Sequence, residues 1–194
     1  RSRPTGDKLR VAHAPSNRAT KGSALIVPVL QELAAAGTVE FDLIEGVSFA
    51  ECGKRLAACD VLVDQMEPSI GGLGALAVEA MALGLAVVTD CRNVRVEDWR
   101  RLPREIGVDI GTMVRGGGGD VRYIFTAAEQ ASDASMLRSK LMVFAGNRGL
   151  LRGAQDRAFQ WASGNASPAG TAALWDLPPG RRTEPVPAPP VPKI

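Results

Sequence analysis

Four short apolar segments alternate with helix-type segments between residues 9 and 89, and this alternation constrains the fold more than any other feature. The apolar segments read as strands at residues 9–14, 39–44, 60–64 and 85–89. Strands that alternate with helices form a parallel sheet with right-handed crossovers. The sequence therefore predicts an α/β fold, a Rossmann-like parallel sheet with helices on both faces.

The segments between these strands carry helix signals. Apolar residues recur at three- and four-residue steps in the first, where Pro28 is expected within the first turns or at a kink. Ser48 can cap the second helix, with Glu51 as its capping-box partner. The third is rich in alanine and follows a glycine-rich turn. The predicted helices cover residues 22–36, about 49–59 and 75–83.

The pattern is harder to interpret after residue 90. Residues 115–120 predict a glycine-rich loop and residues 121–125 an edge strand. A helical pattern from about 134 to 161 is broken near 146–149, and a further helix is expected at 167–175. Seven prolines in the last seventeen residues predict a disordered tail. We divide the chain into a leader, one Rossmann-like domain and a tail, at residues 1–7, 8–177 and 178–194.

Composition narrows the classes of function. A net charge of +2 over 194 residues gives no broad attraction to nucleic acid or to an anionic membrane. Three cysteines without paired spacing argue against a disulfide scaffold or a structural zinc site. No apolar run approaches the ~20 residues of a transmembrane segment, and the first residues lack the apolar core of a signal peptide. We predict a cytoplasmic protein without a transmembrane segment, and the missing initial methionine points to further residues upstream.

Ligands of such sheets bind at the carboxyl ends of the strands, which directs attention to the loops after them. The loop after the first strand, residues 16–22, opens a helix whose free amides attract anions. Arg18 and Lys21 add two cations, and together these groups form a suitable cradle for a diphosphate. A capped helix start with two solvated basic side chains explains the same residues.

A second candidate is the glycine turn at residues 71–74 with the helix that follows it. Glycines let a backbone approach a ligand closely, and the helix start again points amides at an anion. Glu79 stands among apolar residues of that helix, and a buried carboxylate needs a partner such as sugar hydroxyls or an arginine. An ordinary glutamate on an exposed face is the alternative.

Together these segments resemble the C-terminal donor-binding domain of GT-B glycosyltransferases, which have two Rossmann domains, and most closely the retaining family numbered 4. The likeness spans residues 8–90 and fades after them. It rests on motifs in the same order and at suitable spacing: His13-Ala14-Pro15-Ser16-Asn17-Arg18 with Lys21-Gly22, Leu43-Ile44-Glu45-Gly46, Asp60-Val61-Leu62-Val63-Asp64-Gln65, and Gly71 to Gly84.

The resemblance implies a role for each motif. Lys21 and Arg18 would bind the donor diphosphate and stabilise the charge that grows on it as it leaves, and Glu79 would bind the donor ribose. Backbone groups of Gly72, Leu73 and Gly74 would approach the phosphates or the sugar. The remaining implied donor contacts are Ile44 and Glu45 beside the nucleobase, Asp64 and Gln65 on the floor of the cleft, and His13 as a ligand contact or a structural residue.

One position departs from the family pattern. Many members carry two glutamates that flank seven residues; Glu79 matches the second, whereas Gly71 stands in place of the first. Glu67 lies close in sequence and could substitute for it. No His, Cys, Asp and Glu cluster has metal-ligand spacing, so we predict no metal and no cofactor besides the donor substrate.

The prediction for function is therefore a donor-binding domain that binds a nucleoside-diphosphate sugar and supports retaining transfer to an acceptor. The acceptor site of this architecture lies on an N-terminal Rossmann domain absent from these residues, so the chain is expected to be inactive alone. A partner domain or partner chain would complete it. The alternative is a degenerate, non-catalytic binding module. A nicotinamide-binding Rossmann protein is weaker, because the glycine turn follows the third strand instead of the first.

Overall fold

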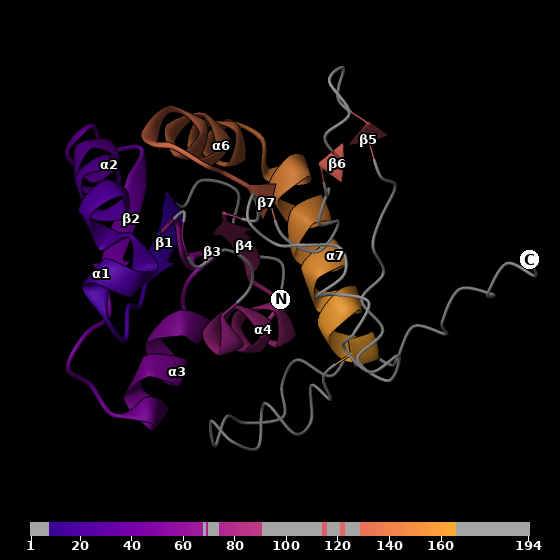
Figure 1. Ribbon diagram of the computed structural model, residues 1–194, viewed down its shortest axis with the longest axis horizontal. Helices are drawn as coiled ribbons and strands as arrows, with labels where there is room; N and C mark the ends of the chain where they lie inside the picture. The colour runs from indigo at the N-terminus through magenta and orange to yellow at the C-terminus, as the bar shows by residue number, and fades with distance from the viewer. Residues whose placement is uncertain are drawn as a thin grey trace, which may run out of the picture.

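A computed structural model describes residues 8–67, 69, 74–90, 114–115, 121–122 and 129–165, and its core is a parallel sheet (Figure 1). The sheet has five strands in the order β2-β1-β3-β4-β7. These strands are β1 (Leu9–His13), β2 (Val39–Leu43), β3 (Val61–Val63), β4 (Ala86–Thr89) and β7 (Glu129–Gln130). The predicted fold class, a Rossmann-like parallel sheet with helices on both faces, is confirmed.

The strand order places a topological switch point in the middle of the sheet. The chain leaves β1 for β2 on one side, with Leu9 opposite Val39 and His13 opposite Leu43. It then crosses to β3 on the other side of β1, where Val11 pairs with Val61. Ligands of open α/β sheets bind outside the carboxyl ends of the two strands at such a point. These ends belong to β1 and β3.

Helices cover both faces of the sheet. Figure 1 shows α2 and α6 on one side and α3 and α4 on the other. Side chains alternate along each strand, as in β3, where Val61 and Val63 join the core under α2 and α6 while Leu62 faces α4. The helices are α1 (Arg18–Lys21), α2 (Ser23–Ala35), α3 (Phe49–Ala57), α4 (Ala75–Ala82), α6 (Ala134–Gly146) and α7 (Arg148–Asn165).

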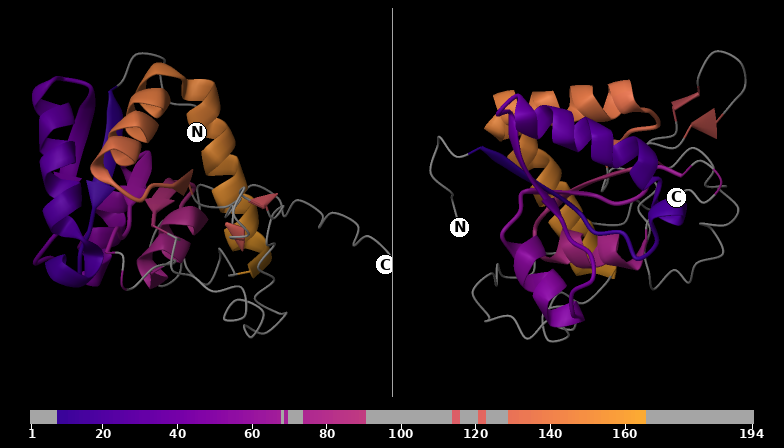
Figure 2. Two further views of the ribbon diagram at one scale, coloured as in Figure 1. Left: turned by 45° about the horizontal axis from the view of Figure 1, so that its top comes forward. Right: turned by 90° about the vertical axis from the view of Figure 1, so that its left-hand side faces the viewer.

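The last described helix belongs to both layers. Leu151 and Ala154 of α7 pack in the core on the α2 and α6 side, whereas Ala158 and Ala162 pack with α4. Figure 2 shows α6 and α7 as two helices that meet at an angle. Asn147 separates them, which confirms the predicted break. None of the helices in the part of the chain described here is long and apolar enough to cross a membrane.

The segment after β1 differs from the prediction. The predicted helix at residues 22–36 is α2, but a separate turn of helix, α1, precedes it. Asn17 caps α1, because its Oδ1 accepts from the amides of Ala19 at 2.9 Å and Thr20 at 3.2 Å. Gly22 ends α1 with a φ of 68°, in the left-handed region that glycine adopts without strain. Lys21 is thereby the last residue of a one-turn helix.

Two strands differ from the prediction as well. β7 was not predicted and extends the sheet beside β4, with Glu129 opposite Val88. Within the predicted edge strand 121–125, β6 (Val121–Arg122) pairs antiparallel with β5 (Val114–Arg115) in a separate two-stranded sheet. The predicted helix at 167–175, the leader and the tail lie outside the described residues.

Candidate functional site

Lys21 is held at the carboxyl end of β3 by two polar side chains. Its Nζ donates to Asp64 Oδ1 at 2.7 Å and to Gln65 Oε1 at 3.2 Å. The exposed fraction is 13% for the Lys21 side chain and 1% for that of Asp64. The amide of Met66 also donates to the Lys21 carbonyl oxygen at 3.1 Å, so the backbone of α1 is fixed to the same segment. The ammonium therefore has a defined place at the switch point.

Asp64 connects this lysine to the start of α4. Its second oxygen, Oδ2, accepts from the amide of Gly74, the N-cap residue of α4, at 2.8 Å. A Cβ at position 74 would lie 2.5 Å from Lys21 Nζ and 3.0 Å from Asp64 Oδ2, so a larger residue here would displace the lysine side chain. A helix start carries a partial positive charge. The carboxylate of Asp64 thus faces two positive features at once.

Gly22 fixes the distance between α1 and the segment after β3. A Cβ at this position would lie 2.8 Å from both the carbonyl carbon of Met66 and the amide nitrogen of Glu67. Real Cβ atoms essentially never approach backbone this closely. The turn that carries Lys21 can therefore rest against the end of β3 only because residue 22 has no side chain.

Arg18, at the start of α1, forms an ion pair with Glu45, in the loop after β2. Its Nε donates to Oε1 at 2.7 Å and its Nη2 to Oε2 at 2.5 Å, a bidentate arrangement. The hydrogen bonds to Glu45 raise the pKa of Arg18, and those from Arg18 lower the pKa of Glu45. The two cations predicted to bind diphosphate thus each have a carboxylate partner in the structure.

Ile44 and Gly46 flank Glu45 and set the course of its loop. Ile44 is buried, and its amide donates to the carbonyl oxygen of His13 at 2.9 Å, which prolongs the β1–β2 ladder. Gly46 has a φ of 65°, with nothing within 4 Å of the place a Cβ would take. Because the side chain of Ile44 is buried, a contact with a nucleobase would come from the backbone of Ile44.

His13 is fully buried at the end of β1, with both ring nitrogens engaged. Nδ1 lies 2.8 Å from the carbonyl oxygen of Val63, and Nε2 lies 2.8 Å from Oγ of Ser23. A carbonyl oxygen only accepts, so Nδ1 donates and Nε2 accepts the Ser23 hydroxyl proton. Burial lowers the pKa of His13. The neutral imidazole joins β1, β3 and α2. A direct contact with the nucleotide-sugar substrate would require His13 to give up one of these two hydrogen bonds.

We expect His13 to remain neutral below the usual histidine pKa of 6.5. Because the folded pKa lies below the unfolded one, its stabilising contribution is complete above 6.5 and is lost as the pH falls from 6.5 through the folded pKa. His13 is the only histidine in the sequence, so its ring resonances in an NMR titration need no assignment. The urea-unfolded chain is the control. A folded midpoint at or above the unfolded one would contradict this arrangement.

Glu79 lies on α4 and is partly buried. Within the segments that the structure covers, no hydrogen bond or ion pair is found for its carboxylate. Burial raises the pKa of Glu79; burial, and after it the charge of Glu79, raises the pKa of the Cys52 thiol on α3. A partly desolvated acid without a protein partner there is suited to hydroxyl donors.

The roles of four further residues, Glu67, Gly71, Gly72 and Leu73, stay predictions. Gly71, Gly72 and Leu73 lie outside the described residues, so their approach to a ligand stays a prediction. Glu67 Oε1 accepts from the hydroxyl of Ser69 at 3.0 Å, and its suggested role in place of the missing acid also stays a prediction.

Asp90 is a polar residue at the carboxyl edge of the sheet that was not predicted as a site residue. This residue follows β4 directly and is buried beside Gln65, whose carbonyl oxygen accepts from its amide at 2.8 Å. The same carbonyl accepts from Oγ1 of Thr89 at 3.1 Å. A charged residue directly after an apolar strand was the available signal, because it marks the carboxyl end of β4.

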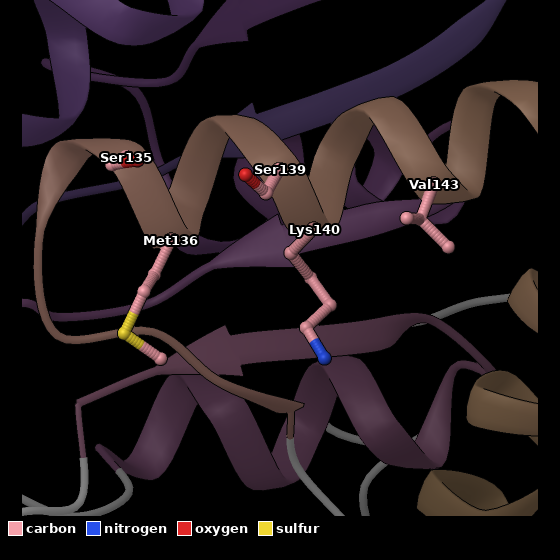
Figure 3. A pocket seen from close by; sticks show the side chains of 5 residues that line it. All are labelled: Ser135, Met136, Ser139, Lys140 and Val143. Atoms are coloured by element: carbon pink, nitrogen blue, oxygen red, sulfur yellow. The ribbon is translucent and has the colours of Figure 1, made fainter.

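No group of three or more His, Cys, Asp or Glu residues that could hold a metal ion occurs in the portion described. A shallow hollow on α6, lined by Ser135, Met136, Ser139, Lys140 and Val143, includes none of the predicted site residues (Figure 3). Its lysine is already paired with Glu129 at 2.7 Å. The carboxyl edge around Lys21 remains the candidate site.

Comparison with known proteins gives one distant structural likeness. No protein-family model matches the chain, and no curated protein matches it. A solved structure that does match is the glycosyltransferase SnogD from Streptomyces nogalater, with a TM-score of 0.43 and 17% identity over 88% of this chain. The chain spans 44% of the length of that structure. A match of this extent says nothing of chemistry, which is therefore argued from the residues of the site.

Proposed function

We propose that the chain is the donor-binding domain of a GT-B glycosyltransferase and binds a nucleoside-diphosphate sugar at the carboxyl edge of its sheet. The observation that carries the proposal is the convergence of the Lys21 ammonium and the start of α4 at the switch point between β1 and β3. Both features attract anions, and a diphosphate is the anion that such an edge commonly takes.

Lys21 retains capacity for a phosphate oxygen. An ammonium has three N–H donors, and two of them are directed at Asp64 and Gln65. The third has no acceptor among the residues that the structure describes. Because the first two bonds fix Nζ, this donor is oriented before a ligand arrives, which lowers the entropic cost of binding.

Arg18 can add a second contact without losing its partner. A guanidinium has five N–H donors, of which Glu45 receives two in the structure. Its side chain is exposed at the rim, so a phosphate can reach the remaining donors. Glu45 itself, with the backbone of Ile44, would then border the nucleobase.

Glu79 would accept hydrogen bonds from the ribose hydroxyls. Gln65, Gly74 and the preceding residues Gly72 and Leu73 would border the phosphates or the sugar, and His13 would hold β1 and β3 in register beneath them. In this proposal the metal-free site relies on side chains and amides alone to neutralise the diphosphate.

The reaction that such a site supports is retaining glycosyl transfer. The bond between the anomeric carbon and the diphosphate oxygen breaks, and its electron pair stays on the diphosphate. A bond from that carbon to an acceptor oxygen forms with the original configuration, while the acceptor proton passes to the leaving diphosphate. Lys21 and Arg18 would stabilise the charge on the leaving group, most strongly in a closed, dry cleft. A second domain or partner chain would supply the acceptor site and the closure.

One observation favours the alternative of a non-catalytic binding module. Lys21 and Arg18 are each paired with a carboxylate, so the site carries less net positive charge than the sequence suggests. The two functions separate by measurement, because a binding module retains affinity for the ligand but does not transfer sugar when the acceptor domain is supplied.

Replacing Lys21 or Glu79 with alanine should weaken the binding of a nucleoside-diphosphate sugar by ~1.5–3 kcal/mol each, since a charge-assisted hydrogen bond is lost. Calorimetry with UDP-sugars, GDP-sugars and NAD measures this and identifies the ligand class. Lys140→Ala is the matched control, because Lys140 also pairs with a carboxylate at 2.7 Å but lies on α6. Unchanged affinity in both site variants would refute the assignment of these residues.

A further inference from the structure

We propose that Asp64 is the internal counter-ion of the phosphate site, and that its negative charge lowers the affinity of the site for a diphosphate. This inference rests on the proposed function and assigns Asp64 a role other than contact with the donor. It follows from where the two carboxylate oxygens of Asp64 lie and from how deeply the side chain is buried.

Both oxygens of Asp64 face groups that a diphosphate would need. Oδ1 accepts from Lys21 Nζ at 2.7 Å, and Oδ2 accepts from the Gly74 amide at the start of α4 at 2.8 Å. The charges of Lys21 and Asp64 cancel. The Asp64 carboxylate therefore already binds the two groups that an anionic ligand would bind at this site.

The carboxylate has little freedom to move away when a ligand arrives. Its side chain is 1% exposed, and the Asp64 amide donates to the carbonyl oxygen of Val88 at 2.9 Å, which anchors the residue between β3 and β4. A phosphate oxygen that reaches the third donor of Lys21 thus comes close to a fixed negative charge. Repulsion between buried charges is screened far less than repulsion in water.

Weakened binding serves a transferase that must release its product. After transfer, the site holds a nucleoside diphosphate, which carries more negative charge than the nucleotide sugar before it. A fixed carboxylate repels this product more strongly than the substrate. Asp64 would therefore favour the departure of the diphosphate while Lys21 still stabilises the transition state.

The test is calorimetry with inorganic pyrophosphate, which has neither base nor sugar, on the whole chain and on Asp64→Asn. Asparagine keeps the size of the side chain and an oxygen for Lys21, but it removes the charge. We expect pyrophosphate to bind roughly ten-fold more tightly to the variant, because a like charge in a poorly solvated site is removed. A donor-contact role for Asp64 predicts unchanged pyrophosphate affinity, and a merely structural role predicts a loss.

Glu129→Gln is the matched control, since Glu129 is the counter-ion of Lys140 at 2.7 Å outside the site. It changes the net charge of the chain by the same amount and should leave pyrophosphate affinity unchanged. An equal gain in this control would show an effect of net charge alone and would overturn the inference.

A second comparison holds even if Asp64→Asn folds poorly alone. Lys21→Met should lose pyrophosphate affinity, and adding Asp64→Asn to it should restore part of the loss by removing the unpaired carboxylate. No gain from Asp64→Asn in either background overturns the counter-ion role while leaving the proposed function intact. A wild-type chain that binds neither pyrophosphate nor any nucleoside diphosphate overturns both.

Discussion

Replacing Gly22 with alanine is expected to lower the free energy of unfolding by about 3 kcal/mol, from a left-handed backbone penalty of ~1–2 kcal/mol and an overpacking cost of similar size. The φ of this residue is 68°, and a Cβ would lie 2.8 Å from the backbone of Met66 and Glu67. Backbone cannot rotate aside as a flexible side chain can, so the overlap must move α1 away from β3. Urea unfolding monitored by circular dichroism measures the loss.

Gly46→Ala is the matched control for this experiment. Gly46 has a similar φ of 65°, but nothing lies within 4 Å of the place its Cβ would take. Alanine there should cost only the backbone penalty, ~1–2 kcal/mol. Equal losses in the two variants would show that the close contact between Gly22 and the segment after β3 does not exist.

The second large loss of stability is expected when the ion pair of Lys21 and Asp64 is broken. Lys21→Met leaves a carboxylate that is 1% exposed without its cation, and removal of one partner from a buried pair typically costs about 3–5 kcal/mol. Asp64 keeps the amide of Gly74 as a donor, which places the expected loss near the lower end. Adding Asp64→Asn should recover part of the stability, because the unpaired charge disappears.

Lys140→Met provides the comparison for the ion pair. Lys140 pairs with Glu129 at the same 2.7 Å, but the side chains are 32% and 21% exposed. Ion pairs that water can reach contribute about 0–1 kcal/mol, so the free energy of unfolding of this variant should be close to that of the wild type. If Lys21→Met were as mild as Lys140→Met, the pair would not be buried in solution as the structure places it.

The sheet could be predicted from the sequence because its signals are local. Each apolar segment between residues 9 and 89 is a strand within a residue or two of the predicted bounds. Ser48 caps α3 as predicted and accepts from the amide of Glu51 at 3.2 Å. Such patterns depend on a few neighbouring residues, so the chain order alone reveals them.

The partners of the charged residues could not be predicted, because they come from distant elements. Lys21 and Asp64 meet only once β3 has been placed beside β1, and Arg18 meets Glu45 only once β2 lies on the other side. The sequence predicted two free cations at a helix start, whereas the structure shows two ion pairs. β7 was missed for a related reason: two polar residues form no pattern, and only β4 beside them makes a strand.

The position of α7 bears on how the domain loses its structure. Because this single helix fills gaps in the cores above and below the sheet, neither core is complete without it. A disturbance that detaches α7 would expose apolar surface in both layers at the same moment. The two layers are therefore expected to melt as one cooperative unit, and the carboxyl-edge site, which both layers support, would be lost with them.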